Sequence, residues 1–145
     1  MVTVFDAAAY ILLKEGSMTA VKLERLCYYA QAWSLVWDEN PLFGEEFQAW
    51  ANGHVCPDLY RRHRGMFRID PGDVGGDPDA IDTDGRETID AVLEHYAPMD
   101  AYRLTTLTHH ETPWLEACGG LKNGERCVTV ITHAAMAEYY GGFAD

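Results

Sequence analysis

Three consecutive polar residues, His109-His110-Glu111, are the first candidates for chemistry in this 145-residue chain. A histidine with a nearby glutamate can serve general acid–base catalysis. Residues one or two positions apart on a helix do not share a face, however, so His109 and Glu111 would not converge there. The sequence also lacks H-E-x-x-H, G-x-S-x-G and glycine-rich phosphate motifs. We therefore expect no enzymatic activity, and an enzyme using His109 and Glu111 stands as an alternative hypothesis.

The four cysteines are candidates for metal binding or disulfide formation. Cys27, Cys56, Cys118 and Cys127 are widely spaced and form no C-x-x-C pair. Tetrahedral zinc sites usually show paired ligands at short spacing. We expect reduced, partly buried thiols, no metal site and no cofactor.

An aspartate-rich segment over residues 65–85 suggests calcium binding. It holds five glycines, two prolines and six aspartates. When Asp82, Asp84 and Gly85 are aligned to positions 3, 5 and 6 of an EF-hand loop, Ala80 and Ala91 fall where essential acidic ligands belong. The pattern thus excludes an EF-hand and predicts a solvated loop.

The stretch KLERLCYYAQAW, residues 22–33, belongs to a helix predicted from Thr19, its N-cap, to about Asp38. Most positions around this helix are apolar, which is typical of a central helix packed on several sides. Cys27 has no histidine or lysine in the segment to lower its pKa, so a core position is favoured over a nucleophile. The polar positions Glu24, Gln31 and Asp38 recur every seven residues, and we expect them to form a solvent-exposed stripe.

The other elements are predicted from caps, breakers and periodicity. Helices are expected over about 4–15, after Pro57, from Asp84 to Pro98, over 100–109, after Thr112, and from Thr132 to Tyr140. Asp84 with Glu87 resembles a capping box, as does Thr3 with Asp6. Residues 45–50 and 128–131 are predicted strands. The fold class is therefore mainly α: a single compact domain, residues 1–145, of about six helices with a small two-stranded β element.

Charge limits the classes of partner. The formal net charge is -12, and residues 70–100 alone carry ten acidic residues and one basic residue, Arg86. Arg61, Arg62, Arg64 and Arg68 form the one basic cluster. An acidic domain repels phosphate backbones as a whole, so we expect no direct nucleic-acid binding and favour a basic protein partner. With no apolar run of 18 residues and no basic leader, we expect no membrane span, no secretory signal and a cytoplasmic location.

Four ordered blocks resemble the Panacea domain, the SocA-like antitoxin domain of bacterial and phage toxin–antitoxin systems. The blocks are KLERLCYYAQAWSL, PLFGEEFQAWANGHVCPDLY, LTHHETPW and VITHAAMAEYYG, which together span about residues 3–141. The resemblance implies a mostly helical domain that neutralises a protein toxin by direct binding and has no established catalytic residues. It further implies toxins that attack translation through tRNA or nucleotide signalling, and in one branch an adaptor that delivers the toxin to a AAA+ protease. Some relatives carry an additional N-terminal DNA-binding region, for which we expect no room here.

The sequence departs from this family at positions that could affect partner choice. His54 and Cys56 stand where proline and valine are common, and Glu24-Arg25 where Gln-Lys is common. We expect the toxin interface around residues 52–64 and 109–114, which are rich in residue types found at binding hot spots. The same blocks can equally be read as turn and cap structure. The candidates are Asn52, His54, Asp58, Tyr60, Arg61, His63, His109, Glu111 and Trp114. The sequence leaves the toxin's identity and the oligomeric state open.

Overall fold

The computed structural model describes residues 2–118 and 127–143. Within them, the helices are α1 (Val4–Glu15), α2 (Ala20–Trp37), α3 (Pro57–His63), α4 (Thr83–Tyr96), α5 (Ala101–His109), α6 (Thr112–Ala117) and α7 (His133–Gly141), with a short 3-10 helix at Pro78–Ala80. The strands are β1 (Met18–Thr19), β2 (Phe47–Trp50), β3 (Gly53–Val55), β4 (Arg68–Ile69) and β5 (Thr129–Ile131). The prediction of a mainly α fold is confirmed.

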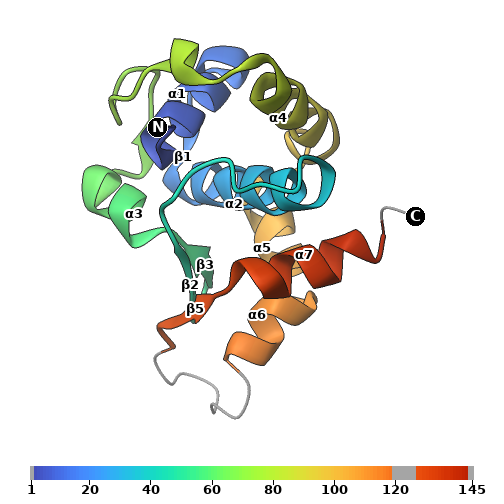
Figure 1. The fold of residues 1–145 in the computed structure, drawn as a ribbon. Coiled ribbons are helices and arrows are strands. Elements are labelled where there is room, and N and C mark those ends of the chain that lie inside the picture. The colour runs from blue at the N-terminus through green and yellow to red at the C-terminus, as the bar shows by residue number, and fades with distance from the viewer. Residues whose placement is uncertain (1, 119–126, 144–145) are drawn as a thin grey trace.

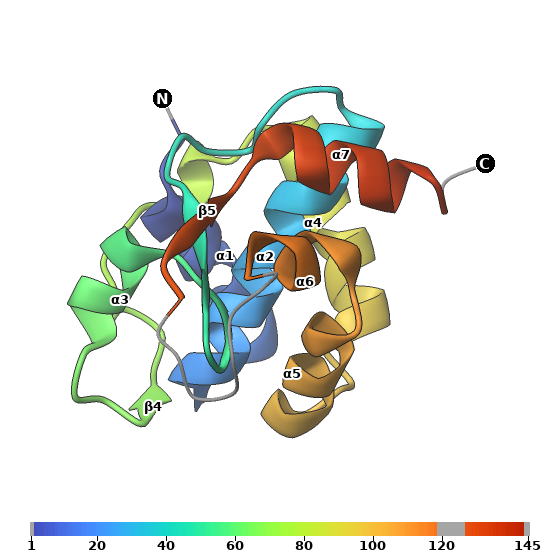
Figure 2. The same ribbon diagram turned by 90° about the horizontal axis from the view of Figure 1, so that it is seen from below.

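Helix α2 is the centre of the fold. It contacts α1, α3, α4, α5, α7 and strand β3, and Figures 1 and 2 show these elements arranged around it. Its residues Leu23, Leu26, Cys27 and Ala30 are fully buried in the hydrophobic core. The prediction that this helix is packed on several sides is confirmed.

Local capping signals set several helix ends as predicted. Thr3 and Asp6 form a reciprocal capping box at the start of α1, and Gly16 follows the helix with φ of 79°. Thr19 and Thr132 cap α2 and α7. These caps use contacts within one helical turn, so the sequence alone is sufficient to predict them.

Two predicted caps are wrong. The N-cap of α4 is Asp82, whose side chain accepts a hydrogen bond from the Gly85 amide at 2.8 Å, rather than Asp84. Buried, extended Ile81 precedes it, so the helix begins two residues earlier than expected. The N-cap of α6 is Glu111, which makes no capping bond because its carboxylate is used elsewhere.

The β structure is larger than predicted. Strands β2 and β5 pair antiparallel, as expected, with Phe47 opposite Ile131. Strand β3 extends this sheet to three strands in the order β3-β2-β5, and β1 and β4 form a second sheet of two strands. The prediction of one two-stranded element is therefore wrong. The missed strands have only two or three residues, too few for a periodicity signal.

The predicted solvent stripe on α2 is also wrong. Glu24 and Gln31 are only 2% and 0% exposed, and Asp38 is half-buried. The Gln31 amide donates to the Phe43 carbonyl at 2.8 Å and accepts from the Leu42 amide at 2.7 Å. Asp38 accepts from the Thr88 hydroxyl at 2.7 Å. These polar residues are buried because distant segments satisfy their hydrogen bonds.

The cysteines divide into two pairs. Cys27 and Cys56 are free and buried, as predicted. Cys118 and Cys127 form a disulfide, so the prediction of four reduced thiols is wrong. Cys118 follows α6 and Cys127 precedes β5, and these two elements contact each other. The spacing of nine residues gave no sign of this proximity.

Candidate protein-interaction site

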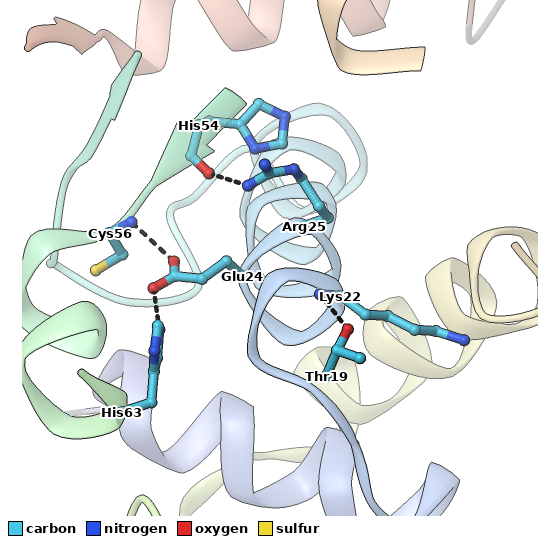
Figure 3. Close-up of polar contacts among 7 residues, drawn as sticks. All are labelled: Thr19, Lys22, Glu24, Arg25, His54, Cys56 and His63. Atoms are coloured by element: carbon cyan, nitrogen blue, oxygen red, sulfur yellow. Dashed lines mark hydrogen bonds and ion pairs between the residues drawn. The ribbon is translucent and has the colours of Figure 1, made fainter. Parts of the chain in front are cut away.

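The candidate site is built around the β2–β3 hairpin and the N-terminal half of α2. The hairpin turns at residues 51–52, and Gly53 adopts a φ of 130°, a conformation that favours glycine. Pro57 then opens α3, where its missing amide hydrogen costs nothing. This order of elements places α3 and the hairpin against the same end of α2 (Figure 3).

Glu24 joins three elements below the surface. Its carboxylate accepts a hydrogen bond from the Cys56 amide at 2.9 Å and one from His63 Nε2 at 2.7 Å. Figure 3 shows the Glu24 side chain extending between these two groups from α2. Burial raises the pKa of Glu24, and the bonds from His63 and Cys56 oppose this effect. The arrangement locks α3 and the end of β3 onto α2.

Arg25 holds the hairpin from the next position of α2. Its two terminal nitrogens donate to the carbonyl oxygens of His54 at 2.6 Å and Asn52 at 2.7 Å. The His54 imidazole stacks on the Tyr28 ring, with 3.4 Å between centroids, and its Nε2 is 2.9 Å from the Thr108 hydroxyl. The hairpin is thus fixed to α2 through both its backbone and a side chain.

A second buried group links α2 to the C-terminal half of the chain. The hydroxyls of Tyr29 and Tyr140 donate to Glu111 Oε1 at 2.7 and 2.8 Å, and the Tyr140 and Tyr28 hydroxyls are 3.2 Å apart. Burial raises the pKa of Glu111, opposed by the bonds from the two tyrosines. Burial likewise raises the pKa of Tyr29 and of Tyr28. The adjacent tyrosines of the KLERLCYYAQAW stretch therefore direct their hydroxyls inward.

A groove of about 710 Å³ lies above the Glu24 and Arg25 contacts. Its apolar lining includes exposed side chains, among them Phe67 at 81% and Val21 at 44% exposure. Trp50 and Tyr60 also line it and contact each other edge-to-face at 5.0 Å. Exposed aromatic and aliphatic groups gathered at a concave surface are typical of a protein-interaction site.

The structure brings the two predicted interface blocks to the same hairpin. Asn52, Tyr60 and His63 line the groove. From the other block, Trp114 donates its indole N–H to the Trp50 carbonyl at 2.9 Å and stacks on His109. Three of the nine candidates are buried, so they could not contact a partner directly in this structure: His54, His63 and Glu111.

The remaining candidates are surface groups of α3. Asp58 and Arg61 form an ion pair one turn apart on this helix. Arg62, which was not a candidate, donates to the Val74 carbonyl at 2.7 Å, so part of the basic cluster secures the aspartate-rich loop. Arg61 and Asp58 stay at the edge of the surface that the groove defines.

The alternative of an enzyme that uses His109 and Glu111 finds no support in how these two side chains lie. His109 packs on Trp114, whereas Glu111 accepts hydrogen bonds from Tyr29 and Tyr140, and no hydrogen bond joins the two residues among those of the described chain. Burial and then the charge of Arg25 lower the pKa of His109. Glu111 therefore accepts hydrogen bonds within the core, and His109 packs on Trp114, the residue that bonds to the hairpin.

Several site residues were missed from the sequence. Glu24 was assigned to solvent, and neither Arg25 nor Phe67 was considered for the interface. One signal was available: Met66 and Phe67 are two large apolar residues next to glycine and arginine in an otherwise polar loop. The buried pair on α2 had no such signal, because its partners lie about 30 or more residues away.

Neither a metal site nor a membrane-spanning helix is found among the described residues. Within residues 2–118 and 127–143, no group of three or more His, Cys, Asp or Glu side chains could hold a metal ion. In the same ranges, none of the helices is long and apolar enough to cross a membrane.

The structure is a mainly helical domain with a polar network beneath an apolar groove. The sequence model of the family described as "Antitoxin SocA-like, Panacea domain" matches residues 23–115, which include most of α2, both hairpin strands and α3. This match covers more than half of the chain, and the chain belongs to this family of SocA-like antitoxin domains. It matches no curated protein and no solved structure.

The buried histidine predicts a pH dependence of stability. Burial, followed by the charge of Arg25, lowers the pKa of His54 well below 6.5. Below that pH the unfolded chain binds a proton that folded His54 excludes, so stability falls as pH drops. We expect His54→Gln to reduce the slope between about pH 7.5 and 5.5 by up to about 1.4 kcal/mol per pH unit.

Urea unfolding of the wild-type and His54→Gln proteins at several pH values measures the difference between their slopes of stability against pH. Glu24 and Glu111 have raised pKa values, so their stabilising contributions are lost as pH rises, the opposite direction. These carboxylates are present in both proteins and cancel in the comparison. Identical slopes for wild type and His54→Gln would contradict the prediction.

Proposed function

We propose that residues 1–145 act as one antitoxin domain that neutralises a cognate protein toxin by direct, non-enzymatic binding in the cytoplasm. The observation that carries this proposal is membership of the SocA-like antitoxin family, matched over residues 23–115. The groove on the hairpin side supports it, because Met66, Phe67 and Val21 expose apolar surface there without burying it in the chain's own core.

The groove face is the proposed contact surface for the toxin. Asn52 and Tyr60 from the predicted interface line it, and Arg61 and Asp58 lie on the adjoining helix α3. Five candidates would act indirectly. His54, His63 and Trp114 hold the hairpin and α3 in place, His109 stacks on Trp114, and Glu111 links α2 to α7. In this proposal, the exposed groove residues bind the toxin, and the groups beneath them maintain the shape of the groove.

Replacing Phe67 by aspartate is expected to abolish most of the toxin protection. A buried aromatic hot spot contributes about 2 kcal/mol or more, so the Kd of the complex should rise about 30-fold or more. Phe67 is 81% exposed, so the substitution should leave the melting temperature nearly unchanged. Growth rescue and co-purification would measure the effect, once a toxin has been identified in the reading frame next to this chain's gene.

Phe143→Asp provides the matched control. Phe143 is also an exposed phenylalanine, at 64%, but it packs on Tyr139 at the end of α7. We expect this variant to protect as well as wild type. Equal loss of protection in both variants, or none in either, would exclude the groove as the contact surface.

The same system separates neutralisation from the adaptor alternative. Neutralisation by occlusion predicts a stable stoichiometric complex and full protection in a strain that lacks the AAA+ protease. Protection and toxin loss that both require the protease would favour the adaptor. For the catalytic alternative, His109→Gln tests the histidine without removing the core carboxylate; retained protection would exclude this role.

A further inference from the structure

The floor of the groove contains a buried cation. Arg25 lines the groove and is only 3% exposed. Its terminal nitrogens donate to two backbone carbonyls, those of His54 and Asn52. Both partners are neutral dipoles, so they satisfy hydrogen bonds without balancing the charge.

The described residues supply no carboxylate to Arg25. Glu24 is its neighbour in sequence, but this carboxylate is held by the Cys56 amide and His63 (Figure 3). Within residues 2–118 and 127–143, no ion pair includes Arg25, and its Nε has no hydrogen-bond partner. Buried charges in proteins are normally paired by direct contact, and Arg25 has no such contact with a carboxylate among the described residues. The position therefore favours an anionic group from another molecule.

The one carboxylate close to Arg25 among the described residues acts on it without contact: burial lowers the pKa of Arg25 and the charge of Glu24 opposes this effect, but the two side chains form no ion pair. Two neighbouring imidazoles, His54 and His109, each have a buried nitrogen without a partner among the described residues. Arg25 contributes to the lowered pKa of both, which places the three groups within electrostatic range of one another. Figure 3 shows the His54 ring beside the Arg25 guanidinium.

Gly53 determines how closely the hairpin approaches this cation. A Cβ atom at Gly53 would lie 2.5 Å from Arg25 Nη2 and 3.0 Å from its Nε. Only glycine leaves the guanidinium its present position, and its φ of 130° also favours glycine. The turn thus holds the cation at the groove floor.

The rim of the groove also carries positive charge. Arg64 lines it and is exposed, and exposed Arg68 follows the lining residue Phe67, whereas Arg61 is paired with Asp58. This contrasts with residues 70–100, which carry the excess of acidic residues. The groove is therefore apolar and locally basic on a chain that is acidic overall.

We infer that the groove takes an apolar segment of the toxin that carries a carboxylate, and that this carboxylate pairs with Arg25. The inference rests on the proposed antitoxin function. It restricts which part of a toxin can bind: the segment that enters the groove carries a carboxylate, whatever the net charge of the whole toxin. A guanidinium matches a planar carboxylate through charge-assisted hydrogen bonds, and the apolar walls exclude water around the pair.

The unmodified chain allows a direct test with two small probes. Phenylacetate has an aromatic ring and a carboxylate, whereas phenylacetamide has the same ring without charge. We expect phenylacetate to cause saturable NMR shifts of the Arg25 Nε–H and the Gly53 amide, and phenylacetamide to leave both unchanged. Equal shifts with both probes, or no saturable shift with phenylacetate, would overturn the inference.

A second test uses a cognate toxin, identified first by co-purification with this chain. We expect Arg25→Met to weaken the complex by at least about 30-fold, the range for truncating one partner of a buried charge pair. Neutralising one toxin carboxylate, Asp→Asn or Glu→Gln, should weaken the wild-type complex similarly and add little to Arg25→Met. If Arg25→Met does not fold, the phenylacetate experiment decides alone.

The outcomes separate this inference from the proposed function. A tight wild-type complex in which no toxin carboxylate couples to Arg25 would overturn the inference and leave the antitoxin function standing. Absence of any complex between the wild-type chain and the toxin would count against both.

Discussion

Replacing Glu24 by alanine is expected to lower the free energy of unfolding by about 2–6 kcal/mol, because it leaves two buried hydrogen-bonding groups without a partner at about 1–3 kcal/mol each. Glu24 and His63 are 2% and 5% exposed. Without the carboxylate, the His63 imidazole and the Cys56 amide lose their hydrogen-bond acceptor in a buried position. Urea unfolding followed by circular dichroism measures the loss.

Glu24→Gln is the informative comparison. Its amide oxygen can still accept one of the two hydrogen bonds, so we expect a smaller loss of about 1–2 kcal/mol. Lys22 lies two positions earlier on the same helix and donates to the Ala97 carbonyl. It takes part in neither of the two hydrogen bonds of Glu24. Equal losses for the alanine and glutamine variants would contradict this expectation: glutamine keeps the side-chain volume, so the carboxylate itself, rather than packing or one retained hydrogen bond, would account for the role of Glu24.

Tyr28→Ala is expected to cost about 3–5 kcal/mol of stability, as for other large aromatic residues removed from a core. The Tyr28 side chain is fully buried, stacks on His54 and meets the Phe47 ring edge-on at 5.4 Å. Its removal would leave a cavity beneath the β2–β3 hairpin. Thermal and urea unfolding would both report the change.

Tyr28→Phe, with Tyr102→Ala as a control, tests how much stability the Tyr28 ring itself contributes. Tyr28→Phe keeps the ring and removes only the hydroxyl contact with Tyr140, so about 1 kcal/mol should be lost. Tyr102 is 81% exposed, and Tyr102→Ala should change stability by less than about 0.5 kcal/mol. A loss for Tyr28→Phe as large as for Tyr28→Ala would contradict a packing role for the ring.

The helical part of the fold was predictable because its signals are local. The caps at Thr3, Thr19 and Thr132 act within one turn, and Pro57 marks the start of α3. The apolar stripe of α4 follows helical spacing and is buried as expected, with Ile89, Val92, Leu93 and Tyr96 inward. Pairing of β2 with β5 was also anticipated, because each strand has a short β-prone sequence.

The features that were missed depend on long-range contacts. Strand β4 exists because Arg68 and Ile69 pair with residues 18–19, about 50 positions earlier. Glu24 and Gln31 are buried because hairpin, helix and loop groups from elsewhere satisfy them. A helical wheel places a polar side chain outward by default, and it contains no information about which distant backbone group will meet that side chain.

The sequence did not show how deeply the candidate residues lie. The blocks 52–64 and 109–114 both contact the hairpin, the second through Trp114 and the Trp50 carbonyl. Residue type alone did not separate half-buried Tyr60 from buried His63, although both belong to α3. That separation depends on the helix face that α3 turns toward α2, which a helix of about two turns leaves ambiguous.

The bonds from Glu24 and Arg25 to the hairpin and α3 have a thermodynamic consequence for recognition. They fix two walls of the groove before any partner arrives, so little conformational entropy of the antitoxin backbone is lost on association. Ordering of the exposed Met66 and Phe67 side chains is then the main entropic cost on this side of the interface. Most of any structural adjustment on binding falls to the toxin, and different toxins could be accommodated only if each presents a segment that fits the same preformed shape.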